Sequence, residues 1–284
     1  MKLDPSTFDE LRRAIYSLCG IVVTNDKHYL IVTRLEPILK RHALPTYESL
    51  AQGLRMGNPT LQQDVVEAIT TKETSFNRDG HPFDELRRTI LPEFANRALE
   101  RKAQGLLASA RTRIWCAAVA TGQEAYSVAM AVADFLATRP GIALTQDDFP
   151  ILATDISQNA LAVAREGRYT LAELGRGLTP EQRTRYFRPV DGYWVVDDAL
   201  RRSIELRRLN LVQAIPNMGA FDIILCRNVL IYFDEAARRR LLDGFYQALN
   251  PGGILIIGAA ESIYGISDAF TTERVGNTFV QRKR

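Results

Sequence analysis

The sequence predicts an α/β protein in which an N-terminal all-α domain precedes a domain built on a mostly parallel sheet. Three observations support this prediction. Apolar residues keep helical spacing through about the first 75 residues, strand and helix patterns alternate from about residue 113, and a hairpin pattern closes the chain. A chain of 284 residues is long enough for one or two such domains with a sizeable core.

The first domain, residues 1–75 with a linker to about residue 90, is expected to contain four helices. The first keeps apolar residues at helical spacing from Phe8 to Leu18 and ends at Gly20. The second covers about His28 to His42, and Pro37 inside it predicts a kink or a restart. Two shorter helices complete the domain, at about 46–57 and about 60–70.

The second domain, residues 91–284, alternates strand and helix patterns, which predicts a parallel sheet covered on both faces. The expected strands are 113–117, 149–154, 221–226 and 254–258, and the expected helices end near 137, 166 and 249. The hairpin around Gly276-Asn277 is typical of the antiparallel edge of such a sheet.

One stretch, about 176–209, breaks this alternation. Asp191-Gly192 is a turn pattern that precedes the β-prone run Tyr193–Val196, and Ser203–Leu209 is a second β-prone run. The pattern predicts a small antiparallel insertion.

Composition excludes several classes of function. Lys+Arg 36 against Asp+Glu 33 gives a net charge of only +3, which disfavours a nucleic-acid partner. Three cysteines and three histidines, far apart in the chain, predict neither a metal site nor a disulfide framework. The chain has no apolar run of a length that a signal peptide or membrane span needs. We therefore expect a cytoplasmic protein in a reducing compartment, without membrane insertion.

The ends of three strands predict a ligand at one edge of the sheet. The first strand leads into small residues with a single glycine, Gly122, whereas a dinucleotide fingerprint needs three. The second ends at Asp155, which either accepts from ribose hydroxyls or caps the helix near Ser157. The third delivers Arg227 and Asn228 to the same edge. Together these features favour a nucleoside-containing ligand without a pyrophosphate over a plain strand–helix connection.

Five segments taken together carry a family resemblance. They are Thr70–Phe83, Ile114–Met130, Ile151–Asn159, Phe221–Asp234 and Pro251–Ser262. In these segments the sequence resembles the CheR-type chemoreceptor glutamate methyltransferases, which use S-adenosylmethionine. The resemblance implies a Rossmann-like class I methyltransferase domain, with the small insertion, behind a helical receptor-docking domain.

The resemblance also implies roles for individual residues. The cofactor-binding residues are Lys72, Thr74, Arg78, Glu124, Asp155, Asn210, Leu211, Arg227 and Asn228. Arg78 and Tyr232 match the catalytic positions, where Arg78 orients the incoming carboxylate and Tyr232 lines the methyl path. Several residues depart from the family pattern: Lys72 replaces a common asparagine, Asn77 a usual aromatic, Ala125 a usual proline, and Val119-Ala120 a usual small-Ser pair. A lysine places a cation near a sulfonium unless it points away or pairs with a carboxylate.

The implied reaction needs no general base. A glutamate nucleophile has a pKa of about 4.3, so it is ionised at neutral pH and can attack the methyl of S-adenosylmethionine directly. The products are a glutamate methyl ester on the receptor and S-adenosylhomocysteine. Proximity in a site that excludes water supplies the rate enhancement.

The expected partner is the acidic helical bundle of a chemoreceptor's cytoplasmic region. The stretch 27–55 carries a local basic excess, and the family's receptor-facing helix matches 28–42, where Arg34 and Lys40 occupy its basic positions. A solvated surface is the alternative explanation of these charges. A monomer is expected.

Other functions remain open from the sequence. One alternative is an S-adenosylmethionine-dependent enzyme for a small molecule or another protein. A second is a module that binds S-adenosylmethionine or its product without turnover and signals by interaction. An RNA methyltransferase is disfavoured, since the chain has no strongly basic tail and no stripe of stacking aromatics.

Overall fold

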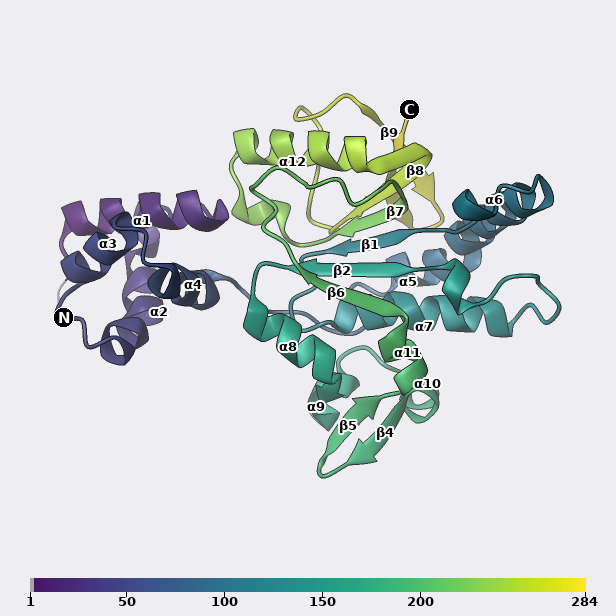
Figure 1. The fold of residues 1–284 in the computed structure, drawn as a ribbon, viewed down its shortest axis with the longest axis horizontal. Helices are drawn as coiled ribbons and strands as arrows, with labels where there is room; N and C mark the ends of the chain where they lie inside the picture. The colour runs from purple at the N-terminus through teal and green to yellow at the C-terminus, as the bar shows by residue number, and fades with distance from the viewer. Residues whose placement is uncertain (1–2) are drawn as a thin grey trace.

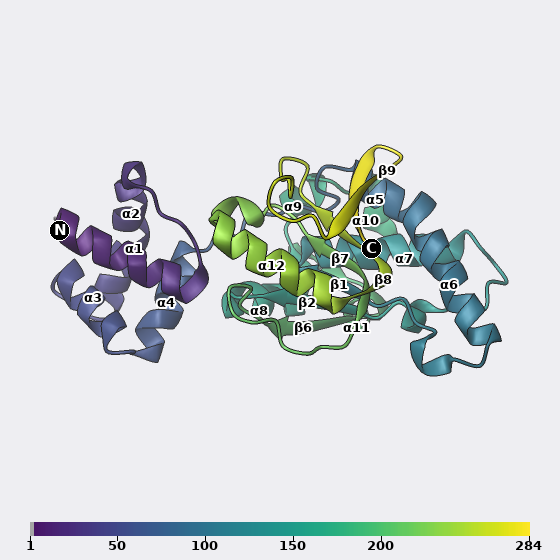
Figure 2. The same ribbon diagram turned by 90° about the horizontal axis from the view of Figure 1, so that it is seen from above.

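The computed structural model describes residues 3–284, which form a helical domain beside a larger domain built on a central sheet (Figure 1). The helical domain contains α1 (Pro5–Cys19), η1 (Asn25–Lys27), α2 (His28–Arg41), α3 (Tyr47–Arg55) and α4 (Pro59–Ile69). These helices pack around a core of their own. Figure 2 shows the two domains side by side along the long axis of the molecule.

The helix ends of this domain follow from local sequence. The Asp4 side chain caps α1 by accepting from two backbone N–H groups, and Gly20 ends the helix in the left-handed conformation. Asn58 caps α4 in the same way as Asp4 caps α1. The helix does not restart at Pro37, since α2 runs through this residue as one helix.

A run of short helices then packs against one face of the central sheet. It consists of α5 (His81–Glu85), the π-helical turn η2 (Leu86–Ile90), α6 (Leu91–Ala103) and the 3₁₀ turn η3 (Leu107–Ser109). Leu86, Ile90 and Phe94 are buried in the core between this run and the sheet. The residues after about 80 are therefore part of the cover of the sheet.

The central sheet has the strand order β6-β2-β1-β7-β8-β10-β9. Its strands are β1 (Ile114–Ala117), β2 (Ile151–Asp155), β6 (Ile204–Arg208), β7 (Phe221–Cys226), β8 (Leu249–Ile257), β9 (Phe270–Val275) and β10 (Thr278–Lys283). The first five in spatial order run parallel, and the β9–β10 hairpin is antiparallel at one edge, as the sequence predicts. Every residue of β1, β2 and β7 is buried, which requires cover on both faces.

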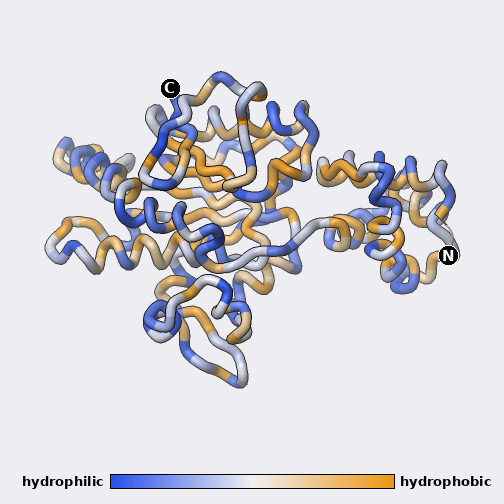
Figure 3. The backbone as a smooth tube through the Cα atoms, turned by 180° about the vertical axis from the view of Figure 1, so that it is seen from behind, coloured by the Kyte–Doolittle hydropathy of each residue, from blue (hydrophilic) through white to orange (hydrophobic). Residues whose placement is uncertain are grey.

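Helices supply that cover. On one face lie α7 (Gln123–Ala137) and α8 (Gln158–Glu166); the short turn η4 (Gln146–Asp148) lies between α7 and β2. On the other face lies α12 (Glu235–Ala248), which follows the 3₁₀ turn η5 (Leu230–Tyr232). Figure 3 shows hydrophobic residues running through the central strands. Within residues 3–284, no helix combines the length and the apolar character that a membrane span requires.

The small antiparallel sheet differs from its predicted bounds. It has the order β3-β5-β4, from β3 (Arg168–Tyr169), β4 (Phe187–Val190) and β5 (Tyr193–Val196), and it projects from the main body with α9 (Leu171–Gly175) and α10 (Pro180–Tyr186) (Figure 1). After α11 (Asp198–Arg202), β6 pairs in parallel with β2. Assigning Ser203–Leu209 to the insertion was therefore wrong: a β-prone run does not specify whether its partner strand is local or distant.

Candidate active site

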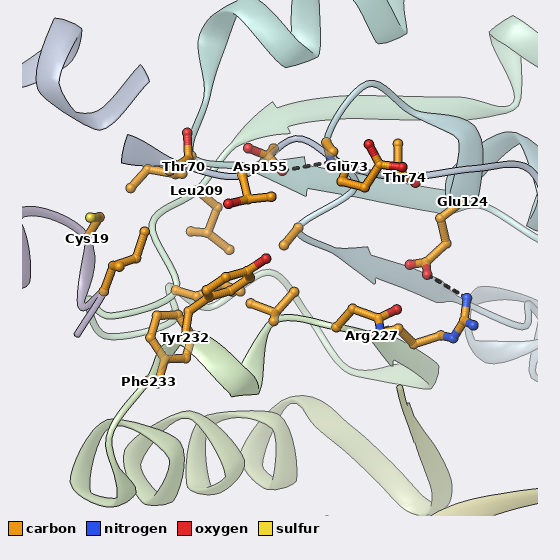
Figure 4. A pocket seen from close by; sticks show the side chains of 18 of the residues that line it. Cys19, Thr70, Glu73, Thr74, Glu124, Asp155, Leu209, Arg227, Tyr232 and Phe233 are labelled. Carbon is orange, nitrogen blue, oxygen red and sulfur yellow. Dashed lines mark hydrogen bonds and ion pairs between the residues drawn. The ribbon is translucent and has the colours of Figure 1, made fainter. Parts of the chain in front are cut away.

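A cavity of about 920 Å³, counting the space at its open mouth, lies at the carboxyl edge of the parallel strands. This is the edge at which open α/β sheets bind ligands. Its walls come from the end of α1, the 70–78 linker, and the loops after β1, β2, β6 and β7. Figure 4 shows side chains from both domains pointing into it.

The loop after β1 keeps its backbone close to the cavity. Ala118 and Ala120 have φ values of 62° and 49°, and Gly122 has a φ of 97°. A Cβ added to Gly122 would lie 2.7 Å from the Cβ of Ala164, so the approach of the loop to α8 requires glycine there. The loop then passes into α7, with Glu124 in the first helical turn.

Asp155, at the end of β2, is buried beside this loop. Its Oδ1 accepts from the Ser157 N–H at 2.8 Å, and its Oδ2 accepts from the Ala120 N–H at 2.8 Å. Burial raises the pKa of Asp155, while these two N–H groups oppose the rise. Ser157 is the N-cap of α8, so the alternative that Asp155 caps this helix is wrong. Each carboxylate oxygen keeps a lone pair for a ligand.

Arg227 holds Glu124, the second buried carboxylate at the cavity. Its guanidinium lies 3.1 Å from Glu124 Oε2 and 2.8 Å from Asp79 Oδ2, and it donates to the Arg78 carbonyl at 2.6 Å. The ring of Phe83 lies 5.1 Å from the guanidinium carbon. Burial raises the pKa of Glu124, and the positive charge of Arg227 opposes the rise. Arg227 lines the cavity as predicted, yet most of its donors serve to position Glu124 and the backbone of the linker.

Glu261 performs a similar task at the end of β7. Its carboxylate accepts from the backbone N–H groups of Asn228 at 2.8 Å, Val229 at 2.8 Å and Gly258 at 2.7 Å. Asn228 has a φ of 60°, so these bonds hold it in a left-handed conformation at the cavity wall. The sequence analysis missed both Glu261 and Asp79. They lie inside segments that carry the family resemblance, but their partners are distant in the chain.

The linker places two predicted residues at the cavity and one away from it. Thr74 and Arg78 line the cavity. Lys72 does not: its Nζ lies 3.0 Å from Glu67 Oε2 and donates to the Glu67 carbonyl at 2.8 Å. The prediction that Lys72 contacts the cofactor is not supported, because the side chain pairs with a carboxylate of α4. This is the condition under which a lysine is tolerated near a sulfonium.

The far end of the cavity joins the two domains. Asn210 and Leu211 line it, and Asn210 Nδ2 also donates to the Leu18 carbonyl of α1 at 2.8 Å. Cys19 and Ile21 of the helical domain complete this wall, which the sequence analysis did not foresee.

Tyr232 comes from η5, and its hydroxyl points toward the middle of the cavity (Figure 4). Its carbonyl accepts from the Val22 N–H at 3.0 Å, which fixes the segment after α1 beside the turn that carries the tyrosine.

The two residues predicted to meet a receptor lie on α2, outside the cavity. Arg34 donates to the carbonyls of Ala68 at 3.2 Å and Ile69 at 2.6 Å, so it caps the end of α4. One nitrogen of the Arg34 guanidinium is thus bonded within the domain, and contact of Arg34 with a receptor stays a prediction. Lys40 is exposed and forms an ion pair with Glu36 at 2.8 Å.

The cavity has the chemistry of a site for a nucleoside with an ammonium group. Two buried carboxylates, Glu124 and Asp155, stand at separate points, and the wall near Leu211 and Ile21 is apolar. Among the described residues that line the cavity there is no histidine, and burial raises the pKa of the Cys19 thiol to about 11. The lining therefore suits S-adenosylmethionine and supplies neither an imidazole base nor a thiolate nucleophile.

Comparison with known proteins agrees with this assignment. Residues 6–70 match the family described as CheR methyltransferase, all-alpha domain, and residues 72–278 match CheR methyltransferase, SAM binding domain. The chain is 37% identical over 264 residues to chemotaxis protein methyltransferase 1 of Pseudomonas aeruginosa, covering 93% of this chain and 92% of the relative. It is 39% identical to chemotaxis protein methyltransferase 1 of Vibrio cholerae, covering 92% and 91%.

A third relative, the chemotaxis protein methyltransferase of Escherichia coli, is 32% identical over 279 residues, covering 95% of this chain and 89% of the relative. These matches confirm the resemblance over both domains. The chain therefore belongs to the CheR methyltransferase family, and S-adenosylmethionine is its cofactor.

Proposed function

We propose that this protein methylates glutamate side chains in the cytoplasmic region of chemoreceptors, giving glutamate methyl esters in sensory adaptation. The observation that carries the proposal is a cofactor cavity whose lining, among residues 3–284, includes a cation, Arg78, and a phenol, Tyr232, but no histidine. An ionised carboxylate is a nucleophile that needs no base. The printed names of the relatives, chemotaxis protein methyltransferases, support the same substrate class.

The buried carboxylates suggest how the cofactor is held. We assign the methionine ammonium to Glu124 and the ribose hydroxyls to Asp155, whose free lone pairs accept hydrogen bonds. Asn210 and Leu211 flank the adenine in this arrangement, while Thr74 and Asn228 complete the wall between the two carboxylates. Lys72 and Asn77, which depart from the family pattern, are both absent from the lining and so do not obstruct this pose.

When bound, S-adenosylmethionine supplies a methyl group on a sulfonium; its carbon–sulfur bond breaks as a carboxylate oxygen bonds the carbon, leaving S-adenosylhomocysteine. The protein has to bring the carboxylate into line with that bond and exclude water. Arg78 donates to the Glu73 carbonyl at 3.2 Å, and its remaining donors have no partner within residues 3–284. These donors suit a bidentate bond to the substrate carboxylate. The Tyr232 hydroxyl lines the path of the methyl group.

A labelling assay tests the proposal. Receptor cytoplasmic fragments incubated with methyl-labelled S-adenosylmethionine are expected to gain a base-labile label. Tyr232→Phe is expected to lower kcat about tenfold, the worth of one hydrogen bond in the transition state, with an unchanged Kd for S-adenosylhomocysteine. Tyr246→Phe, on α12 outside the cavity, is the control and should keep full activity.

Label on a metabolite instead of the receptor would redirect the proposal to a small-molecule substrate. Binding of S-adenosylhomocysteine with no turnover on any receptor fragment would favour a signalling module without activity.

We further propose that α2 docks on the acidic receptor bundle through Lys40, which is exposed and paired with Glu36 of the same helix. Lys40→Glu is expected to lower receptor methylation severalfold, more at low salt than at high salt, because the interaction is electrostatic and exposed. Binding of S-adenosylhomocysteine should not change. Arg239→Glu is the matched control, since Arg239 forms an exposed pair with Glu235 at the same spacing on α12. Equal losses in both variants would contradict docking at α2.

A further inference from the structure

Glu67, in the last turn of α4, reaches from the helical domain into the base of the methyltransferase domain. Its side chain is only 9% exposed, and its Oε2 lies 2.5 Å from the Ser157 hydroxyl and 3.0 Å from Lys72 Nζ. Its Oε1 accepts from the Asn159 N–H at 3.2 Å. A carboxylate is therefore buried against the N-terminal turn of α8, where the helix dipole favours negative charge.

The contact continues to the cavity through Ser157. The Ser157 hydroxyl donates to Glu67 and accepts from the Ala160 N–H at 3.0 Å, while the Ser157 N–H donates to Asp155 Oδ1. Asp155 in turn accepts from the Ala120 N–H. An unbroken series of hydrogen bonds thus joins α4 to the carboxylate at the ribose end and to the loop after β1.

Lys72 fixes the other side of Glu67. Its ammonium bonds both the carboxylate and the main-chain carbonyl of Glu67, so the linker turns back onto α4 at this residue. Thr71 and Glu73, its neighbours in sequence, both line the cavity. The lysine that departs from the family pattern thereby directs the linker along the cavity wall. Burial alone would raise the pKa of Glu67, but its bonds to Ser157 and Lys72 lower it, so the carboxylate is ionised at neutral pH.

We propose that Glu67 is a positioning residue for the cofactor site, which holds Asp155 and the linker in their binding geometry through Ser157 and Lys72. The proposal rests on the placement of the ribose at Asp155 given above. It means that the helical domain contributes directly to cofactor affinity, in addition to any contact with a receptor. Because Glu67 lies behind Asp155 and outside the cavity lining, its loss should weaken binding without altering the reacting groups.

The test measures the Kd for S-adenosylhomocysteine by calorimetry, without any receptor. Glu67→Ala is expected to raise Kd about tenfold, and Glu67→Gln, which keeps one acceptor, to raise it less. The kcat at saturating S-adenosylmethionine should stay within about twofold of the wild type. Asp64→Ala is the matched control: this carboxylate lies one turn earlier on α4 and pairs with Arg41 and His42 inside the helical domain. It should lower the melting temperature without changing Kd.

A double variant separates positioning from general stability. Ser157→Ala is expected to weaken binding at least as much as Glu67→Ala, and Glu67→Ala/Ser157→Ala should be no weaker than Ser157→Ala within about twofold. Two results would overturn the proposal. One is a fold-change in Kd of the double variant that equals the product of the two single-variant changes. The other is an unchanged Kd in a folded Glu67→Ala protein. If Glu67→Ala does not fold, Glu67→Gln carries the same comparison. Failure of receptor methylation leaves this test intact, whereas a wild type that does not bind S-adenosylhomocysteine would contradict the cofactor assignment itself.

Discussion

Asp155→Ala is expected to weaken binding of S-adenosylhomocysteine by about 100-fold or more. Two hydrogen bonds from ribose hydroxyls to a buried carboxylate are worth about 1.5–3 kcal/mol each, which corresponds to at least two orders of magnitude in Kd. The substitution also removes the acceptor for the Ala120 and Ser157 N–H groups, so the loop after β1 loses its anchor.

Calorimetry with S-adenosylhomocysteine measures this effect, and thermal melting shows whether the variant is folded. Asp148→Ala is the control, because Asp148 precedes the opposite end of the same strand and forms an ion pair with Lys102 at 2.7 Å. It should lose some stability and keep the wild-type Kd. A folded Asp155→Ala protein with a Kd within about threefold of the wild type would disprove the placement of the ribose.

Arg227→Met is expected to produce the largest loss of stability, about 3–5 kcal/mol, since it leaves the buried Glu124 without its countercharge. Removal of the cation is expected to raise the pKa of Glu124 further, so a smaller fraction of Glu124 is a carboxylate that can accept the ammonium at pH 7. Affinity for S-adenosylhomocysteine should therefore fall about tenfold or more at pH 7 and recover in part as the pH rises.

The pH dependence of stability has the opposite sign. A carboxyl whose pKa in the folded state exceeds its unfolded value of about 4.3 stabilises the fold at low pH and loses that contribution as the pH rises through the folded pKa. Urea denaturation of Arg227→Met should thus show a stability that declines above the ordinary glutamate range, while its affinity increases.

Two further variants isolate the cause. Arg227→Met/Glu124→Gln should regain stability, because Glu124 no longer leaves an unpaired charge buried at this point, and should still bind poorly. Arg282→Met removes an arginine paired with Glu93 and Glu273 at the antiparallel edge of the sheet, and it should leave Kd unchanged. An Arg227→Met protein as stable as the wild type at pH 7 would contradict the role assigned to Arg227.

The sequence was most informative where function follows consecutive residues. Asp155 and Arg227 directly follow buried apolar runs, so the parallel-sheet rule alone brings them to one edge. The role of Glu124 was predicted from the family resemblance, while the strand–loop–helix pattern with its single glycine predicted only a ligand-binding loop. The structure brings all of these, with Thr74, Arg78, Asn210, Leu211, Asn228 and Tyr232, to one cavity.

Residues whose role depends on a distant partner were not predictable. Glu67 on an exposed-looking helix and Glu261 after the last parallel strand resemble ordinary surface acids until the fold supplies Ser157 and the Asn228 backbone. For the same reason, the segment of β6 was wrongly assigned to the antiparallel insertion, because its partner strand β2 lies some fifty residues earlier. The bond from Arg34 to the end of α4 was likewise not predictable, because its acceptor lies 35 residues away in the chain.

The corner formed by Cys19 and Ile21 has a consequence for protein engineering. Since this corner lines the cavity together with Asn210 and Leu211, the helical domain is not an interchangeable module attached to a self-sufficient methyltransferase domain. A chimera that borrows the helical domain of a relative to redirect receptor choice would carry a foreign wall into the cofactor cavity. The recipient loop at Asn210, which bonds the Leu18 carbonyl, would have to be exchanged with it. The two domains therefore have to be exchanged together, and receptor choice and cofactor affinity are expected to change together.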